Sequence, residues 1–156
     1  MAIEDVKRYF QQWGVEDRIQ EFDVSSATVE QAAAALHCEG KRIAKTLSFL
    51  VEGKAILIVA AGDARIDNQK YKAYFHTKAA MLSPTDVFEL VGHPVGGVCP
   101  FGVKDGVDVY LDASLKRFQT VFPACGSNNS AIELTLPELE KYSHYRAWVD
   151  LCKGWE

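Results

Sequence analysis

The chain has 156 residues, of which 48% are hydrophobic and 24% are charged, a balance that excludes disordered and fibrous proteins. A chain of this length is expected to fold as one domain, residues 1–156, with its own core. The formal net charge of −4 excludes a protein that coats long duplex nucleic acid, so no DNA partner is expected. A local basic patch could still hold a short single-stranded end.

Compartment and cofactors follow from what the sequence lacks. The longest apolar run, residues 55–61, is too short to span a bilayer. Acidic residues occupy the place of a signal peptide's basic region. The four cysteines are widely spaced without a Cys-x-x-Cys pair, which predicts reduced thiols and no zinc site. We therefore expect a cytoplasmic protein with no membrane partner, no metal and no cofactor.

Apolar spacing and cap patterns predict five helices. Thr28 begins a capping-box pattern, Asp67 can cap the helix after it, and Ser83 is followed by proline and an acid. In chain order, the helices are expected over residues 2–13, from 29 towards Gly40, over 68–75, from 84 to Gly92, and from 136 onward.

The strands are predicted from alternation and from one continuous apolar run. A hairpin joins residues 46–51 to residues 54–61. The second of these strands is apolar on both faces and should lie in the middle of the sheet. Shorter strands are expected over 18–24, 78–82, 107–111, 119–124 and 131–136. This order of elements is typical of an α+β fold, a mixed sheet with helices around it. The apolar C-terminal tail, with Trp148 and Trp155, is expected to dock either on this body or on a second subunit.

Residues 92–102 hold four of the eleven glycines and two of the five prolines. Such a loop is stiff and can take unusual backbone angles. It is either a connection that needs special turns or a loop whose N–H groups face a ligand oxygen. Cys99 within it could be a nucleophile, but Val98 and Pro100 supply no base, so a small filler is the alternative.

Other catalytic patterns are missing. Gly97 and Gly102 have the glycine spacing of a phosphate-binding loop, but Val103 stands where lysine is required. The four histidines are scattered and are interpreted as surface or core residues. Lys45 precedes an apolar strand, where it either continues the surface charge of Lys41 or directs its ammonium at a carbonyl or phosphate oxygen.

Three segments stand in an order that resembles one family. They are residues 41–47 with Lys45, the Gly-Gly-x-x-Pro-x-Gly stretch 96–102, and residues 109–127. Together they resemble the YbaK family of aminoacyl-tRNA deacylases, relatives of the editing domain inserted in bacterial prolyl-tRNA synthetases. The resemblance runs over about residues 24–142. It implies a partly barrel-like mixed sheet surrounded by helices.

The implied activity is metal-free hydrolysis of mischarged aminoacyl-tRNA, often tRNA(Pro) carrying alanine, cysteine, serine or threonine. The partners would be the acceptor end of the tRNA and an aminoacyl-tRNA synthetase. Lys45 takes the family's essential lysine position. The substrate-binding positions that match are Gly96, Gly97, Val98, Cys99, Pro100, Phe101, Gly102, Gly126, Ser127 and Asn128. Position 128 varies among subfamilies, which leaves the amino-acid specificity open.

Two other function classes remain. One is a non-catalytic module that binds a tRNA end or a nucleotide, or docks on a synthetase. The other is a Schiff-base enzyme that uses Lys45. No histidine base accompanies any motif, which suggests that the substrate supplies part of the proton transfer through the ribose hydroxyl beside the ester. The candidates for phosphate contacts, each also interpretable as surface charge, are Lys41, Arg42, Lys70, Lys72 and Lys104.

Overall fold

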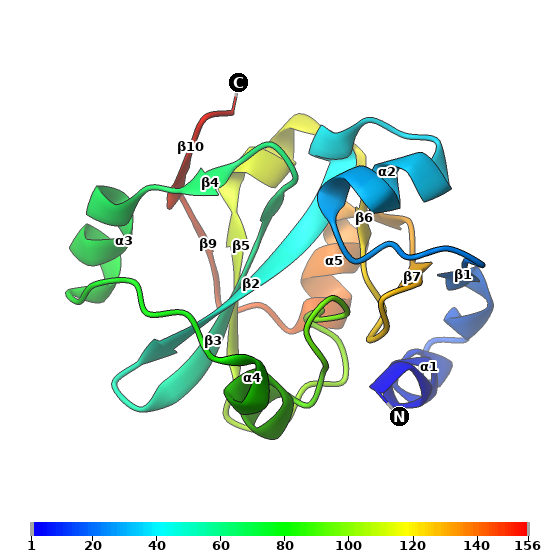
Figure 1. Ribbon diagram of the computed structural model, residues 1–156, viewed down its shortest axis with the longest axis horizontal. Helices are drawn as coiled ribbons and strands as arrows, with labels where there is room; N and C mark the ends of the chain where they lie inside the picture. The colour runs from blue at the N-terminus through cyan, green and yellow to red at the C-terminus, as the bar shows by residue number, and fades with distance from the viewer. Residues whose placement is uncertain (1, 156) are drawn as a thin grey trace.

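The computed structural model describes residues 2–155 and has the expected α+β architecture, a curled six-stranded half-barrel with helices around it (Figure 1). The strand order is β8-β6-β2-β3-β5-β9. Their bounds are β2 Ile43–Val51, β3 Lys54–Ala61, β5 Asp108–Asp112, β6 Thr120–Pro123, β8 Leu134–Thr135 and β9 Ala147–Val149.

The predicted hairpin and its central strand are confirmed. Strand β3 pairs with β2 in antiparallel fashion and with β5 in parallel fashion. Every β3 residue after Lys54 is buried. Leu57 and Val59 belong to one core cluster, whereas Ile56 and Ile58 belong to another. Burial on both faces is why this strand carries no polar alternation.

Two small two-stranded sheets flank the main one. β1 (Gln20–Glu21) pairs with β7 (Ser130–Ala131), and β4 (Arg65–Ile66) pairs with β10 (Cys152–Lys153). The single strand predicted over 131–136 is wrong, because Ala131 pairs with β1 whereas Leu134 pairs with β6. The strand predicted over 78–82 reduces to one bridge between Met81 and Phe49.

The five predicted helices are present, as α1 Ala2–Gln11, α2 Val29–Leu36, α3 Asn68–Phe75, α4 Pro84–Val91 and α5 Leu136–Ser143. Thr28 and Thr135 form complete capping boxes, and Asp67 and Ser83 accept N–H bonds from the first turns of their helices. Short 3₁₀ helices η1 (Glu16–Arg18), η2 (Gly40–Arg42) and η3 (Ala113–Arg117) complete the chain. No helix within residues 2–155 is long and apolar enough to cross a bilayer.

The C-terminal segment docks on the body of the same chain. Leu151 and Cys152 are buried. The buried carboxylate of Asp112 accepts hydrogen bonds from the backbone N–H of Leu151 (2.8 Å) and of Ser114 (3.0 Å). These bonds tie the end of the chain and η3 to the sheet edge at β5.

Candidate functional site

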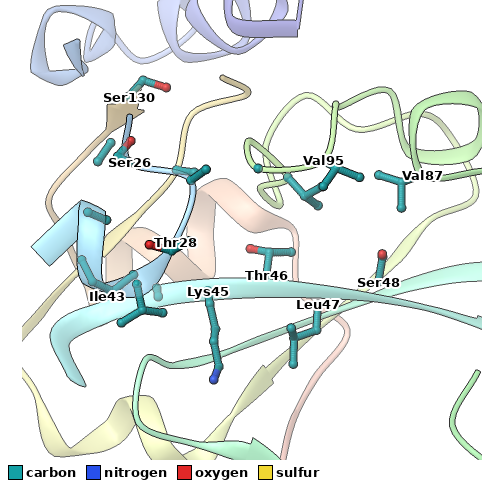
Figure 2. Close-up of a pocket in the computed structure, with 18 of the residues that line it drawn as sticks. Ser26, Thr28, Ile43, Lys45, Thr46, Leu47, Ser48, Val87, Val95 and Ser130 are labelled. Carbon is teal, nitrogen blue, oxygen red and sulfur yellow. The ribbon is translucent and has the colours of Figure 1, made fainter. Parts of the chain in front are cut away.

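A pocket of about 500 Å³ lies against strand β2 (Figure 2). Its walls come from β2, the segment before α2, the start of α4, the glycine loop and the turn after β6. Most of the residues that line it are apolar; they include Ala27, Val29, Ala44, Leu47, Leu82, Val87, Val95, Val98, Phe122, Ala124 and Ala131. Such a mostly apolar hollow with a few polar groups is the usual form of a small-ligand site.

The pocket lies at a gap along the outer edge of β2. Strand β6 pairs with β2 at Ile43 and Ala44 alone. Further along the same edge of β2, the carbonyl oxygen of Ser48 accepts a hydrogen bond from the backbone N–H of Leu82 at 3.2 Å. Between these points, no strand in the described part of the chain pairs with the outer edge of residues 45–47. The sheet edge is therefore open where a ligand can reach its backbone.

Side chains of β2 alternate across this gap. Thr46 and Ser48 rise towards Val95 and Val87, whereas Lys45 points to the other side of the strand (Figure 2). Residues of both orientations line the pocket, so it extends over the strand edge.

The ammonium of Lys45 is held at the turn that follows β3. Its Nζ donates to the carbonyl oxygen of Ala64 and to that of Gly62 (3.3 Å). Burial lowers the pKa of Lys45 below its ordinary value. Two of its three N–H groups are thus engaged by carbonyl groups of the described chain. In this conformation, β2 separates the ammonium from the glycine loop.

The turn is fixed by close backbone packing. A Cβ added to Gly62 would lie 2.0 Å from the carbonyl oxygen of Gly40, so only glycine fits here. The contact joins the turn after β3 to the η2 segment that leads into Lys45.

The glycine loop contacts the second predicted substrate turn directly. A Cβ on Gly97 would lie 2.6 Å from Ser127 N, and one on Gly96 would lie 3.6 Å from the Cβ of Asn128. Gly97 donates its own N–H to Pro94 O at 3.0 Å. The backbone N–H groups of Gly96 and Val98 have no acceptor within residues 2–155, and both residues line the pocket.

The remaining loop residues belong to the core. Cys99 and Phe101 are fully buried, and Pro100 is buried beside them. Cys99 Sγ lies 3.5 Å from His93 Nε2, which lies 2.7 Å from the carbonyl oxygen of Phe101. Burial raises the pKa of the Cys99 thiol to about 12 and lowers that of His93. A thiolate nucleophile is therefore disfavoured, and Cys99 packs as a small core residue.

Two further glycines pack against helix α1. A Cβ on Gly126 would lie 2.9 Å from the backbone of Ala2, and one on Gly102 would lie 3.5 Å from Asp5 O. Both have positive φ. Ser127 turns its hydroxyl to Asn129 and Ser130 (2.9 and 2.6 Å), and Asn128 is exposed beside the loop.

The histidines serve other purposes. His37, His76 and His144 are the left-handed C-caps of α2, α3 and α5, with φ of 55°, 61° and 49°. His93 lies in the core. No histidine, cysteine or carboxylate is among the described residues that line the pocket.

Most of the lysine and arginine side chains that were candidates for contacts with tRNA phosphates interact with other groups of the protein. Lys41 pairs with Glu39, Arg42 with Glu133, and Lys70 with Asp150. Lys104 Nζ donates to the carbonyl oxygen of Glu89. These contacts favour the surface-charge interpretation, although Lys41 also lines a polar hollow of about 600 Å³ beside Trp155.

Sequence reasoning missed the polar part of the pocket wall. Ser26, Thr46 and Ser48 all line it. The signal was present in β2, where Thr46 and Ser48 are polar residues two apart, which places them on one face of a strand.

Known proteins resemble this chain throughout its length. The family model for the aminoacyl-tRNA editing domain matches residues 23–142. An uncharacterized protein of Bacillus subtilis (strain 168), YwhH, is 58% identical over the full length of both chains. A proline–tRNA ligase of Thermosipho melanesiensis is 27% identical over 80% of this chain, which spans 22% of that enzyme.

The fold has solved counterparts. A crystal structure assigned provisionally to a trans-editing enzyme for prolyl-tRNA synthetase superposes with a TM-score of 0.87, at 28% identity over 98% of each chain. With the half-barrel sheet and the pocket against β2, these matches define an editing-domain protein. The chain belongs to the aminoacyl-tRNA editing domain family.

Proposed function

We propose that the protein is a free-standing deacylase that hydrolyses the ester of mischarged aminoacyl-tRNA, with tRNA(Pro) carrying a small amino acid as substrate. The observation that carries the proposal is the pocket at the open edge of β2, which is lined by the glycine loop on one side and by residues of β2 that include Lys45. Its position, in a chain of the aminoacyl-tRNA editing domain family, suits the aminoacyl-adenosine end of a tRNA. The reaction would take place in the cytoplasm, in trans to a prolyl-tRNA synthetase.

An aminoacyl ester is already activated, so the protein need only position a water and stabilise the oxyanion. The N–H groups of Gly96 and Val98 are the loop donors left for that oxygen. Losing one such donor typically lowers the rate about 10²–10³-fold. Lys45 supplies positive charge from the other side of β2, to a carbonyl or phosphate oxygen that reaches over the strand edge.

The proton transfer is assigned to the substrate. The pocket wall offers no histidine or carboxylate among the described residues, so a general base must come from elsewhere. The ribose hydroxyl beside the ester is within reach in any aminoacyl-adenosine. A substrate whose terminal adenosine lacks that hydroxyl should be cleaved far more slowly, and cleavage at the normal rate would contradict this assignment.

The test of the function is a deacylation panel. tRNA(Pro) and other tRNAs, each charged with alanine, serine, threonine, cysteine or proline, are incubated with the wild type, Lys45→Ala and the control Lys78→Ala. Lys78 is exposed and lies outside the pocket. We expect Lys45→Ala to reduce deacylation about 10²-fold or more while the protein stays folded, with a lower melting temperature because the bonds to Gly62 and Ala64 are lost. Lys78→Ala should match the wild type. Absence of deacylation by the wild type would favour the non-catalytic binding module.

A further inference from the structure

Two buried hydroxyls of the pocket have no hydrogen-bond partner within residues 2–155. They are Thr46 Oγ1 and Ser26 Oγ, and Ser26 as a whole is only 8% exposed. An unpaired buried polar group is costly, because it gives up its bonds to water without replacement. Two of them in one pocket therefore need an explanation.

Two other hydroxyls of the pocket are engaged. Thr28 Oγ1 accepts the N–H of Gln31 at 3.1 Å, and Ser130 Oγ lies 2.6 Å from Ser127 Oγ. Both Thr28 and Ser130 also line the pocket. The unpaired state is thus particular to Thr46 and Ser26 among these four residues.

The two unpaired hydroxyls come from different walls. Thr46 rises from β2 at the open stretch of its edge, on the side of the glycine loop (Figure 2). Ser26 precedes α2 and is held by its backbone N–H, which donates to Asn128 O. Much of the remaining wall is apolar, with Ala27, Ala44 and Ala131 among its residues. Rotation about one Cα–Cβ bond moves each hydroxyl between staggered positions, so both can turn to a ligand.

We propose that Thr46 and Ser26 make the pocket select aminoacyl esters whose side chain carries a hydroxyl, seryl or threonyl, over alanyl esters. This inference rests on the proposed deacylase function. A substrate hydroxyl can donate a hydrogen bond to, or accept one from, either of these residues. An alanyl group would leave both unpaired, and a site built for a substrate hydroxyl rejects the analogue that lacks it for that reason.

The selectivity is tested with seryl- and alanyl-tRNA(Pro). The variants are Thr46→Val, which replaces the hydroxyl with a methyl group of similar size, Ser26→Ala, and Thr46→Ser, which keeps the hydroxyl. Thr77→Val, beyond the end of α3 and outside the pocket, is the control. We expect Thr46→Val and Ser26→Ala each to lower the seryl-to-alanyl ratio of kcat/KM about tenfold. Thr46→Ser and Thr77→Val should retain the wild-type ratio.

Binding gives a readout that does not depend on hydrolysis. Calorimetry with non-hydrolysable amide analogues of seryl- and alanyl-adenosine should show tighter binding of the seryl analogue to the wild type and loss of that preference in Thr46→Val. Equal affinity for the two analogues would overturn the inference, even where no deacylation is found. An equal fall in kcat/KM for seryl- and alanyl-tRNA(Pro) would show that the two hydroxyls contact a group common to all aminoacyl esters. That result would also overturn the inference. Deacylation without a seryl preference would leave the deacylase function standing.

Stability separates this role from a structural one. Removing an unpaired buried hydroxyl should leave the melting temperature of Thr46→Val equal to or above that of the wild type. A marked fall would show that Thr46 supports the fold, and would count against a role in ligand selection.

Discussion

At the scale of single residues, position in the fold separates reactive groups from packing groups. Cys99 lies in the glycine loop but is fully buried, and burial raises its thiol pKa to about 12. Lys45 is half-buried, and its ammonium is held by two carbonyl groups. Three histidines that sequence alone left scattered are helix C-caps. The polar groups that the described pocket wall offers are therefore hydroxyls, backbone amides and one ammonium.

We expect Cys99→Ala to retain deacylation. The substitution removes one buried sulfur atom and leaves the pocket wall unchanged, so only a modest loss of stability is expected from the small cavity. The measurement is kcat/KM beside a thermal melt. Iodoacetamide at neutral pH should label half-exposed Cys38 before Cys99. Inactivation that follows alkylation of Cys99 would restore the nucleophile hypothesis.

At the scale of elements, the contact between the glycine loop and the 126–127 turn shapes the pocket wall. Gly97→Val should reduce activity strongly, because its Cβ would lie 2.6 Å from Ser127 N and the backbone must move. Overpacking typically costs about 1–3 kcal/mol, and each kcal/mol lowers the melting temperature by about 2–4 °C at this size. Gly106→Asn is the control, because nothing lies within 4 Å of an added Cβ there and asparagine tolerates a positive φ, here 88°, better than most residues. Full activity in Gly97→Val would show that the glycine loop does not form part of the substrate site.

The start of α5 should make stability depend on acid pH. Glu138 completes the Thr135 capping box and receives Arg18 Nη1 at 2.7 Å. Chiefly through that hydrogen bond, the pKa of Glu138 falls from 4.5 to about 2. A carboxyl whose pKa is lower when folded stabilises the fold above its unfolded pKa, and the effect is lost as pH falls through the folded pKa.

Glu138→Gln keeps a side chain that can complete the cap but removes the ion pair. Between pH 4.5 and about 2, the melting temperature of the wild type should fall more steeply than that of Glu138→Gln. Melts at a series of pH values across this window provide the measurement. Parallel curves for the two proteins would show that the pair with Arg18 contributes nothing to folding.

At the scale of the whole molecule, local patterns predicted the elements and tertiary contacts decided the site. The caps at Thr28 and Ser83 and the apolar strand β3 were predictable, because each depends on a few neighbouring residues. The gap in strand pairing beside Thr46 was not predictable from the sequence. It arises because β6 pairs with only two residues of β2, and that pairing is a tertiary contact. The orientation of Lys45 could have been inferred from strand alternation, but its anchoring at Gly62 and Ala64 depends on a turn 17 to 19 residues away.

The pairing of β3 also has a consequence for the order of folding. Its hairpin partner β2 adjoins it in the sequence, but its other partner, β5, begins only at Asp108. During synthesis, the nascent chain therefore carries an apolar strand with one uncovered edge while α3, α4 and the glycine loop are still being made. Parallel pairings of this kind form late because a long loop must close first. We therefore expect β3, which is central in the finished sheet, to be prone to aggregation while the molecule is incomplete.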